Sequence, residues 1–243
     1  MDTAIASSIS VATLLAAHGS AASPFVIDVR RIQAFEADTT LLAGATWRDP
    51  FTTDDWIKFL PHHSDIVVYC VHGHEISKNA CAALRAAGLK ARYLEGGIEA
   101  WTAHGAPTIK KQSALSIPSP INAPSKWVTR ERPKIDRIAC PWLIRRFIDP
   151  RAEFFYVPAA QVFRDAARLK AVAYDIPGAP VTHEGEWCSF DGLLRAFEIE
   201  DPAVDRLARI VRGADTDRLA LAPQSAGLLA FSLGLSRLHA DDQ

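Results

Sequence analysis

The residue with the clearest potential for chemistry is Cys70, which follows four apolar residues and precedes a predicted helix. A thiol at the carboxyl end of a buried strand faces backbone N–H groups and the positive end of the next helix dipole. Both stabilise a thiolate and bind an anion. In the loop over residues 71–77, Gly73 permits a tight turn, and His72 and His74 can donate to an oxyanion. The alternative is a small cysteine buried in the core.

A second set of polar residues lies in the C-terminal half. Asp136 stands among apolar residues of a predicted helix, and a buried carboxylate needs a partner. His183 follows a predicted strand and Asp215 follows a predicted helix, so we expect the three side chains to converge beside Arg137. Their imidazole and carboxylate groups would suit a divalent metal ion. A bound oxyanion is also compatible, and if only Asp136 and His183 meet, a structural hydrogen bond suffices.

An arginine-rich segment is the strongest local charge bias. Residues 126–151 contain eight basic and three acidic side chains. With Asp136 and Arg137, the guanidinium groups of Arg145 and Arg146 form a candidate second site, because guanidinium forks match the oxygens of chromate or sulfate. The alternative is a solvated helix face on which these arginines pair with nearby acids.

Overall charge excludes a strong global field. The chain has 27 Lys and Arg against 28 Asp and Glu, and residues 113–243 carry 17 of each sign. DNA binding is therefore a weaker interpretation, since no helix-turn-helix pattern accompanies the charges. Four cysteines without a CxxC pair indicate free thiols in a reducing compartment.

The N-terminal segment predicts a first helix, capped by Ser8 or Ser10, and not a signal peptide. The first 29 residues contain no Lys or Arg, whereas a signal peptide begins with positive charge. No apolar run is long enough to span a bilayer. These features predict a cytoplasmic protein without a membrane partner.

The N-terminal half alternates apolar strands with helices, which predicts an α/β fold with a parallel sheet flanked by helices. The strands are expected at Phe25–Asp28, Asp65–Tyr69 and Ala91–Leu94, and a helix at Ala80–Ala87 ends at Gly88.

The C-terminal half predicts a helix-rich α+β domain. A helix is expected over Pro133–Ile148, with Pro141 kinking it or opening a second helix. Strands are expected at Phe154–Val157 and Ala171–Tyr174, and a helix capped by Asp201 runs towards Gly213. A proline-rich stretch separates the halves, which gives a domain over 1–110, a linker over 111–125 and a second domain over 126–243.

Four motifs of the first half resemble the rhodanese homology domain over about residues 8–105. They are Ile27–Arg30, Gly44–Ala45, Cys70 with its loop, and Leu94–Trp101. The resemblance implies the rhodanese fold and a persulfide on Cys70, formed from a small-molecule sulfur donor without a cofactor. It also implies the substrate-binding residues, which would be Arg30, His72, Gly73, His74, Glu75, Ile76 and Ser77.

This loop departs from the usual pattern of the family. Glu75 and Ile76 stand where a basic residue is common, and the loop looks one residue longer, as in phosphatase relatives. Those relatives need Cys-x5-Arg, so phosphatase chemistry is disfavoured. Cys81 is interpreted as a core residue and not as a resolving thiol.

The second half resembles the ChrB-type chromate resistance domain over about residues 126–238. The resemblance rests on Trp127–Arg130, Asp136–Cys140, Trp142–Pro150, Thr182–Gly185, Cys188–Phe190, Asp201–Pro202 and Val211–Asp215. It implies a role in the chromate response. Relatives are expected to continue beyond Gln243, so apolar residues between Leu228 and Leu238 would be exposed or paired in a homodimer.

Together these features predict a rhodanese-like sulfurtransferase joined to a ChrB-like domain, with a role in chromate or oxyanion resistance. The alternative is a chromate-responsive sensor or transcriptional regulator without sulfur-transfer turnover.

Overall fold

The computed structural model describes residues 6–18, 23–60, 65–111, 124–239 and 242. The chain divides into two compact units, residues 1–111 and 112–243. Most of the predicted linker, residues 112–123, lies outside the described residues. None of the helices that the structure describes is long and apolar enough to cross a membrane.

The first unit is built on a parallel sheet in the order β1-β6-β5-β2-β4. Its strands are β1 (Ser8–Ile9), β2 (Phe25–Asp28), β4 (Thr46–Trp47), β5 (Ile66–Tyr69) and β6 (Ala91–Leu94). A separate antiparallel pair joins β3 (Thr40–Leu42) to β7 (Thr108–Lys110). The predicted parallel sheet is confirmed, and β5 in its centre is fully buried because helices cover both faces.

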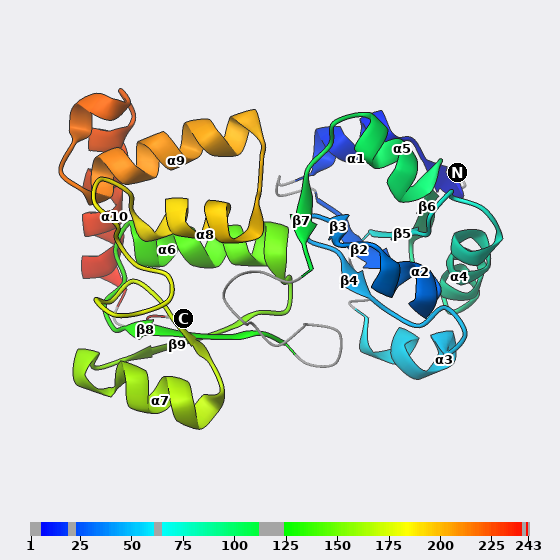
Figure 1. The fold of residues 1–243 in the computed structure, drawn as a ribbon, viewed down its shortest axis with the longest axis horizontal. Helices are drawn as coiled ribbons and strands as arrows, with labels where there is room; N and C mark the ends of the chain where they lie inside the picture. Colours follow the sequence, from blue (N-terminus) through cyan, green and yellow to red (C-terminus); the bar gives the residue numbers. More distant parts are fainter. Residues whose placement is uncertain (1–5, 19–22, 61–64, 112–123, 240–241, 243) are drawn as a thin grey trace. The chain divides into compact units, whose positions relative to one another are not determined.

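The helices of the first unit are α1 (Val11–Ala17), α2 (Ile32–Ala37), α3 (Thr53–Trp56), α4 (Glu75–Ala86) and α5 (Gly97–Ala103), with a 3-10 turn at Ile57–Phe59. Figure 1 shows α1 and α5 on one face of the sheet. On the other face, Trp56 of α3 and Leu84 of α4 pack in a core with Ile27 and Val68.

Two helix ends of the first unit follow the sequence signals and one does not. The Ser10 hydroxyl accepts from the Thr13 amide at 3.2 Å, so Ser10 is the cap of α1. Gly88 has a φ of +82°, as expected just after a helix. The predicted start of this same helix at Ala80 is wrong, because α4 already begins at Glu75. Residues 75–77 are therefore its first turn and not part of an open loop.

The second unit has a small parallel sheet in the order β10-β8-β9. Helices connect its strands, and further helices follow the last strand. The strands are β8 (Lys126–Arg130), β9 (Glu153–Val157) and β10 (Val172–Ala173). The helices are α6 (Asp136–Leu143), α7 (Val162–Leu169), α8 (Ser189–Phe197), α9 (Pro202–Asp215) and α10 (Ser225–Leu238). Short turns lie at Ile144–Ile148 (π), Ala159–Gln161 and Leu219–Leu221 (both 3-10).

Figure 1 shows α7 on one face of this small sheet and α6 with α8 on the other. The helix-rich second unit with a small sheet is confirmed, and α6 and α7 join its parallel strands in turn.

Two predicted helices have different bounds in the second unit. The one expected over residues 133–148 begins at Asp136, because Ile135 adopts a φ of +42°, outside helical geometry. Pro141 lies inside α6, and the π turn follows at Ile144. The helix expected to run towards Gly213 continues to Asp215. Gly213 is a packing position, because a side chain there would clash with the Ser225 hydroxyl oxygen.

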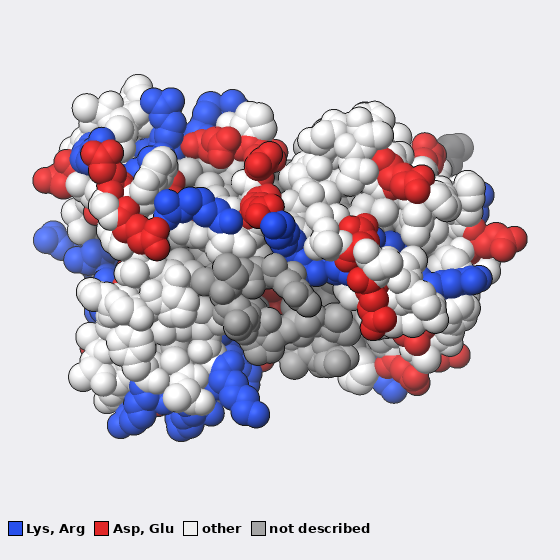
Figure 2. All heavy atoms as spheres, in the orientation of Figure 1, with Lys and Arg blue, Asp and Glu red and all other residues white. Residues whose placement is uncertain are grey.

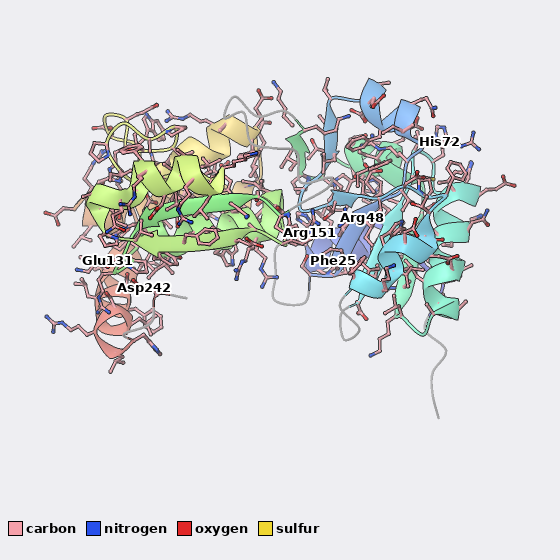
Figure 3. All side chains as sticks on the ribbon, turned by 90° about the horizontal axis from the view of Figure 1, so that it is seen from below. Phe25, Arg48, His72, Glu131, Arg151 and Asp242 are labelled. Carbon is pink, nitrogen blue, oxygen red and sulfur yellow. The ribbon has the colours of Figure 1, made fainter. Side chains whose placement is uncertain are left out.

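Near its C-terminus the chain contacts the residues that follow β8. The Arg132 amide donates to the Asp242 carboxylate at 2.8 Å, and Figure 3 shows Asp242 near Glu131. On α10, Phe231 is 66% and Leu238 is 80% exposed, so this helix presents apolar side chains to solvent. The homodimer expected from them stays a prediction.

Candidate functional site

Cys70 lies at the carboxyl end of β5, directly before the loop that leads into α4. Its thiol is nearly buried, with 6% of the residue exposed, and Sγ lies 3.2 Å from the Ser77 hydroxyl oxygen. The Ser77 hydroxyl also contacts the His74 carbonyl, to which it can donate at 3.2 Å. The first turn of α4 therefore folds back over the sulfur, which places the thiol at the floor of the loop.

Two glycines let the Cys70 loop pack against the segment that opens α5. A side chain at Gly73, where φ is +69°, would meet the Leu94 carbonyl oxygen at 2.5 Å. A side chain at Gly97, where φ is +60°, would clash with the carbonyl of Cys70. The Ile98 amide donates to that same carbonyl at 3.0 Å. Because only glycine fits both positions, the loop and the start of α5 pack backbone against backbone.

The two loop histidines are on the surface. His72 Nδ1 lies 2.9 Å from a carboxylate oxygen of Glu99, and the rings of His72 and His74 are 5.8 Å apart. Figure 3 shows the His72 side chain at the outer edge of its unit. Glu75 is exposed in the first turn of α4, whereas Ile76 packs against the hydrophobic core. Ile76 as a substrate-binding residue stays a prediction, and with its side chain against the core any such contact would come from its backbone N–H.

Arg30 does not serve the Cys70 loop. Its guanidinium is 1% exposed and contacts Asp28 and Asp38, each at 2.6 Å, and it also donates to the Thr40 carbonyl at 3.0 Å. Burial raises the pKa of the Asp28 carboxyl, and the hydrogen bonds and charge of Arg30 oppose this rise. Arg30 is thus a buried structural arginine, and its prediction as a substrate-binding residue is wrong because its donors are already occupied.

The other three cysteines are buried and unsuited to nucleophilic attack. Cys81 is part of the core of the first unit, and burial raises the pKa of its thiol. In the second unit, burial and then the charge of Asp136 raise the pKa of both Cys140 and Cys188. These thiols stay protonated at neutral pH.

A pair of glycine variants tests whether close packing holds the Cys70 loop. Gly97 and Gly105 have similar φ values, +60° and +63°, but nothing lies within 4 Å of a side chain added at Gly105. We expect Gly105→Ala to lower the free energy of unfolding by about 1 kcal/mol and Gly97→Ala by about 2–4 kcal/mol. Urea unfolding measures both. Only Gly97→Ala should change the rate at which iodoacetamide labels Cys70, and equal effects in the two variants would contradict tight packing.

In the second unit, His183 lies among three carboxylates. Its Nε2 atom is 2.9 Å from Asp215, 3.6 Å from Asp136 and 3.5 Å from Asp175. Asp136 is fully buried, and its carboxylate accepts from the amides of Ser189 at 2.5 Å and Phe190 at 3.2 Å. The structure thus brings together the three residues expected to converge and adds Asp175.

Asp175 is the site residue that sequence reasoning missed. It lies two residues after the end of β10, with a φ of +52°, and its side chain is 7% exposed. A signal was present, because the residue comes just after a predicted strand, and carboxyl ends of parallel strands gather at one edge of a sheet. Burial, followed by the charges of Asp215 and Asp175, raises the pKa of Asp136 to about 8.

Arg137 contacts this carboxylate cluster through Asp175. Its Nε lies 3.2 Å from Asp175, and its Nη1 donates to the carbonyls of Arg130 and Glu131 at 3.1 and 2.9 Å. Arg130 contacts the same oxygen of Asp175 at 3.2 Å. Its guanidinium thus positions Asp175, and a role for Arg137 in binding an oxyanion stays a prediction.

Arg145 and Arg146 lie in the π turn at the other end of α6, about 13 Å along the helix from Asp136. They do not join the His183 cluster. Arg145 lies over the Phe154 ring at 5.1 Å and, with Arg151, lines a surface pocket of about 480 Å³. An oxyanion site at these arginines stays a prediction.

Charges of both signs alternate on the face of the molecule shown in Figure 2. A group of Lys and Arg side chains lies at the edge formed by α7 (Figure 2), where Arg164 and Arg168 both contact Asp165, at 3.6 and 3.2 Å. On this one face the charges of both signs form no continuous basic surface of the kind that binds a polyanion such as DNA.

Comparison with known proteins agrees with the two-unit structure. The model of the rhodanese-like domain matches residues 10–104, and the model of the ChrB C-terminal domain matches residues 127–243. Protein ChrB of Cupriavidus metallidurans is 36% identical over 118 residues, which make up 48% of this chain and 35% of that protein. The chain thus spans about a third of that relative's length.

Two solved structures are similar to the first unit. A rhodanese-related protein from Thermoplasma volcanium is 28% identical and covers 42% of this chain and 97% of its own, with a TM-score of 0.36. A full-length protein from Lactobacillus plantarum is 25% identical and covers 43% and 88%, with a TM-score of 0.38. From the matching family models, the chain carries a rhodanese-like domain over residues 10–104, followed by a ChrB C-terminal domain over residues 127–243.

Proposed function

We propose that the first unit is a sulfurtransferase that carries sulfane sulfur as a persulfide on Cys70, within a protein that acts in the response to chromate. One observation carries the proposal: the nearly buried Cys70 thiol lies at the floor of a backbone-held loop at the start of α4. The N-terminus of this 12-residue helix favours negative charge.

The reaction has two steps. In the first, the Cys70 thiolate attacks the outer sulfur of thiosulfate, so a Cys70 S–S bond forms and the sulfur–sulfur bond of thiosulfate breaks to release sulfite. In the second, cyanide attacks the outer sulfur of the persulfide, which gives thiocyanate and regenerates the Cys70 thiolate. No oxidant or reductant enters, because the sulfane sulfur passes unchanged from donor to acceptor.

The loop can bind the donor mainly through backbone N–H groups and the exposed His72 and His74. The side chains of Arg30, which is buried against Asp28, and of Ile76, which packs against the core, do not contribute to donor binding. Glu75 adds a negative charge at the loop. We therefore propose weak binding of a dianion such as thiosulfate and a high KM for it.

The steady-state assay of thiosulfate and cyanide on the intact chain tests this function. We expect thiocyanate to form with parallel double-reciprocal plots, the kinetic pattern of a covalent intermediate released between two substrates. If thiocyanate formation does not exceed the rate without protein, the sulfurtransferase proposal fails. In that case a sensor or regulator without turnover is the better account.

A further inference from the structure

We propose that Asp136, Asp175, His183 and Asp215 of the second unit bind one divalent transition-metal ion, such as Mn²⁺ or Zn²⁺, through carboxylate oxygens and one imidazole nitrogen. This inference is independent of sulfur transfer at Cys70, since it concerns the other compact unit.

The four residues come from different segments and meet at one place. Asp136 opens α6, Asp175 follows β10, and Asp215 closes α9. His183 follows Val181, which pairs with Tyr174 as an extension of β10. The loops after β8 and β10 both lie at the carboxyl edge of the parallel sheet, where α/β proteins commonly bind ligands.

The separations between ligand atoms match a metal coordination sphere. Metal–nitrogen and metal–oxygen bonds of about 2.0–2.2 Å place neighbouring ligand atoms about 2.8–3.6 Å apart at right-angled to tetrahedral geometry. The measured distances from His183 Nε2 to the three carboxylates are 2.9, 3.5 and 3.6 Å. Ligand atoms of Asp136, Asp175 and His183 all lie within 4.8 Å of one another.

Hydrogen bonding to His183 does not account for this arrangement. One imidazole nitrogen carries at most one proton, so it can donate fully to one carboxylate, and Asp215 at 2.9 Å already takes that place. Asp136 and Asp175 nevertheless point oxygens at the same nitrogen from 3.6 and 3.5 Å. A cation between the four groups would give each of them a bond.

Neighbouring donors orient the carboxylates, and Ser189 reaches the oxygens of Asp136 and Asp175 that face His183. Arg130 and Arg137 both contact Oδ2 of Asp175, whereas Oδ1 faces His183 and accepts from the Ser189 hydroxyl at 2.9 Å. At Asp136, the Ser189 amide donates to Oδ2, the oxygen that faces His183, and the Phe190 amide donates to Oδ1. A carboxylate oxygen has two lone pairs, so each oxygen that faces His183 can still bind a cation. Donors of this kind commonly fix the ligands of protein metal sites.

Burial of the cluster is graded from the interior to solvent. The exposed fraction is 0% for the Asp136 side chain, 7% for Asp175, 15% for Asp215 and 41% for His183. An ion can therefore enter beside His183 and keep a water molecule on that side. Imidazole and carboxylate together suit Mn²⁺, Fe²⁺ and Zn²⁺ better than Ca²⁺, which prefers oxygen ligands alone.

Metal titration of the full chain tests the site. After dialysis against EDTA, Mn²⁺ binding is followed by the loss of its free-ion electron paramagnetic resonance signal, and Zn²⁺ binding by calorimetry. We expect at least one of the two ions to bind once per chain, and both His183→Ala and Asp215→Asn to weaken that binding at least tenfold. His239→Ala is the matched control, because His239 is an exposed histidine of the same unit and is not one of the four proposed ligands.

Circular dichroism shows that each variant is folded. If Asp215→Asn unfolds, His183→Ala still tests the site, because the His183 side chain is 41% exposed and its removal should leave the fold intact. The site is refuted if neither ion binds, or if His183→Ala binds as well as His239→Ala. Since thiocyanate formation at Cys70 is measured separately, failure here leaves the sulfur-transfer proposal unaffected.

Discussion

Replacing Cys70 with serine is expected to lower the rate of thiocyanate formation by about a thousandfold or more, because the hydroxyl cannot take up sulfane sulfur. The change is nearly isosteric. The Ser77 hydroxyl oxygen lies 3.2 Å from the Cys70 sulfur, so this hydroxyl can donate a hydrogen bond to the new hydroxyl or accept one from it. The fold should therefore be retained. The measurement is kcat/KM for thiosulfate together with the circular dichroism spectrum.

Cys81→Ser is the matched control for this prediction. Cys81 lies on α4 within the same unit, but it is part of the core and its thiol pKa is raised by burial. We expect kcat/KM to change by less than a few fold in this variant. If Cys81→Ser abolishes activity and Cys70→Ser does not, the assignment of the nucleophile is wrong.

Replacing Arg30 with methionine is expected to lower the free energy of unfolding of the first unit by about 3–5 kcal/mol, the usual cost of leaving one partner of a buried ion pair alone. Asp28 is fully buried, and without Arg30 it would keep only neutral donors such as the Tyr69 hydroxyl at 2.9 Å. Hydrogen exchange of the β5 amides at increasing urea concentration measures this loss. Arg31→Met, at the neighbouring exposed arginine, should change stability by no more than about 0.5 kcal/mol.

The loss in Arg30→Met should depend on pH in a defined direction. Burial raises the pKa of Asp28, and the variant removes the charge and hydrogen bonds that oppose this rise. A carboxyl whose pKa is raised in the folded state contributes stability at low pH and loses it as pH increases through that pKa. The variant should therefore be closest to the parent protein in acid and furthest from it at neutral pH. A deficit that grows on acidification would contradict this account.

The strands of the first unit could be predicted because their sequence pattern leaves little choice. Residues 25–27 and Ile66–Tyr69 are continuous apolar runs, which are typical of strands covered on both faces. Gly88 marks the end of α4 through its left-handed backbone. The start of α4 was predicted too late, because residues 75–77 carry few apolar positions and the helical periodicity becomes visible only from Ala80.

The candidate sites could be predicted only in part, because side-chain partners depend on tertiary contacts. Arg30 looked available as an anion ligand, and nothing in its neighbourhood along the chain reveals that Asp38 and the Thr40 carbonyl close around it. Burial of polar groups gave a better guide: a carboxylate expected in the core at Asp136 required partners, and His183 lies beside it. Asp175 was missed although it follows a strand, since its turn conformation depends on contacts with Arg130 and Arg137.

The most direct test of the account is to find the sulfur itself. After incubation of the intact chain with thiosulfate and removal of excess donor, alkylation and peptide mass spectrometry locate any added sulfur atom. The account predicts a persulfide on Cys70 that disappears when cyanide is added, with Cys81, Cys140 and Cys188 unmodified in their buried positions. A persulfide distributed over those buried thiols, or none on Cys70, would contradict it.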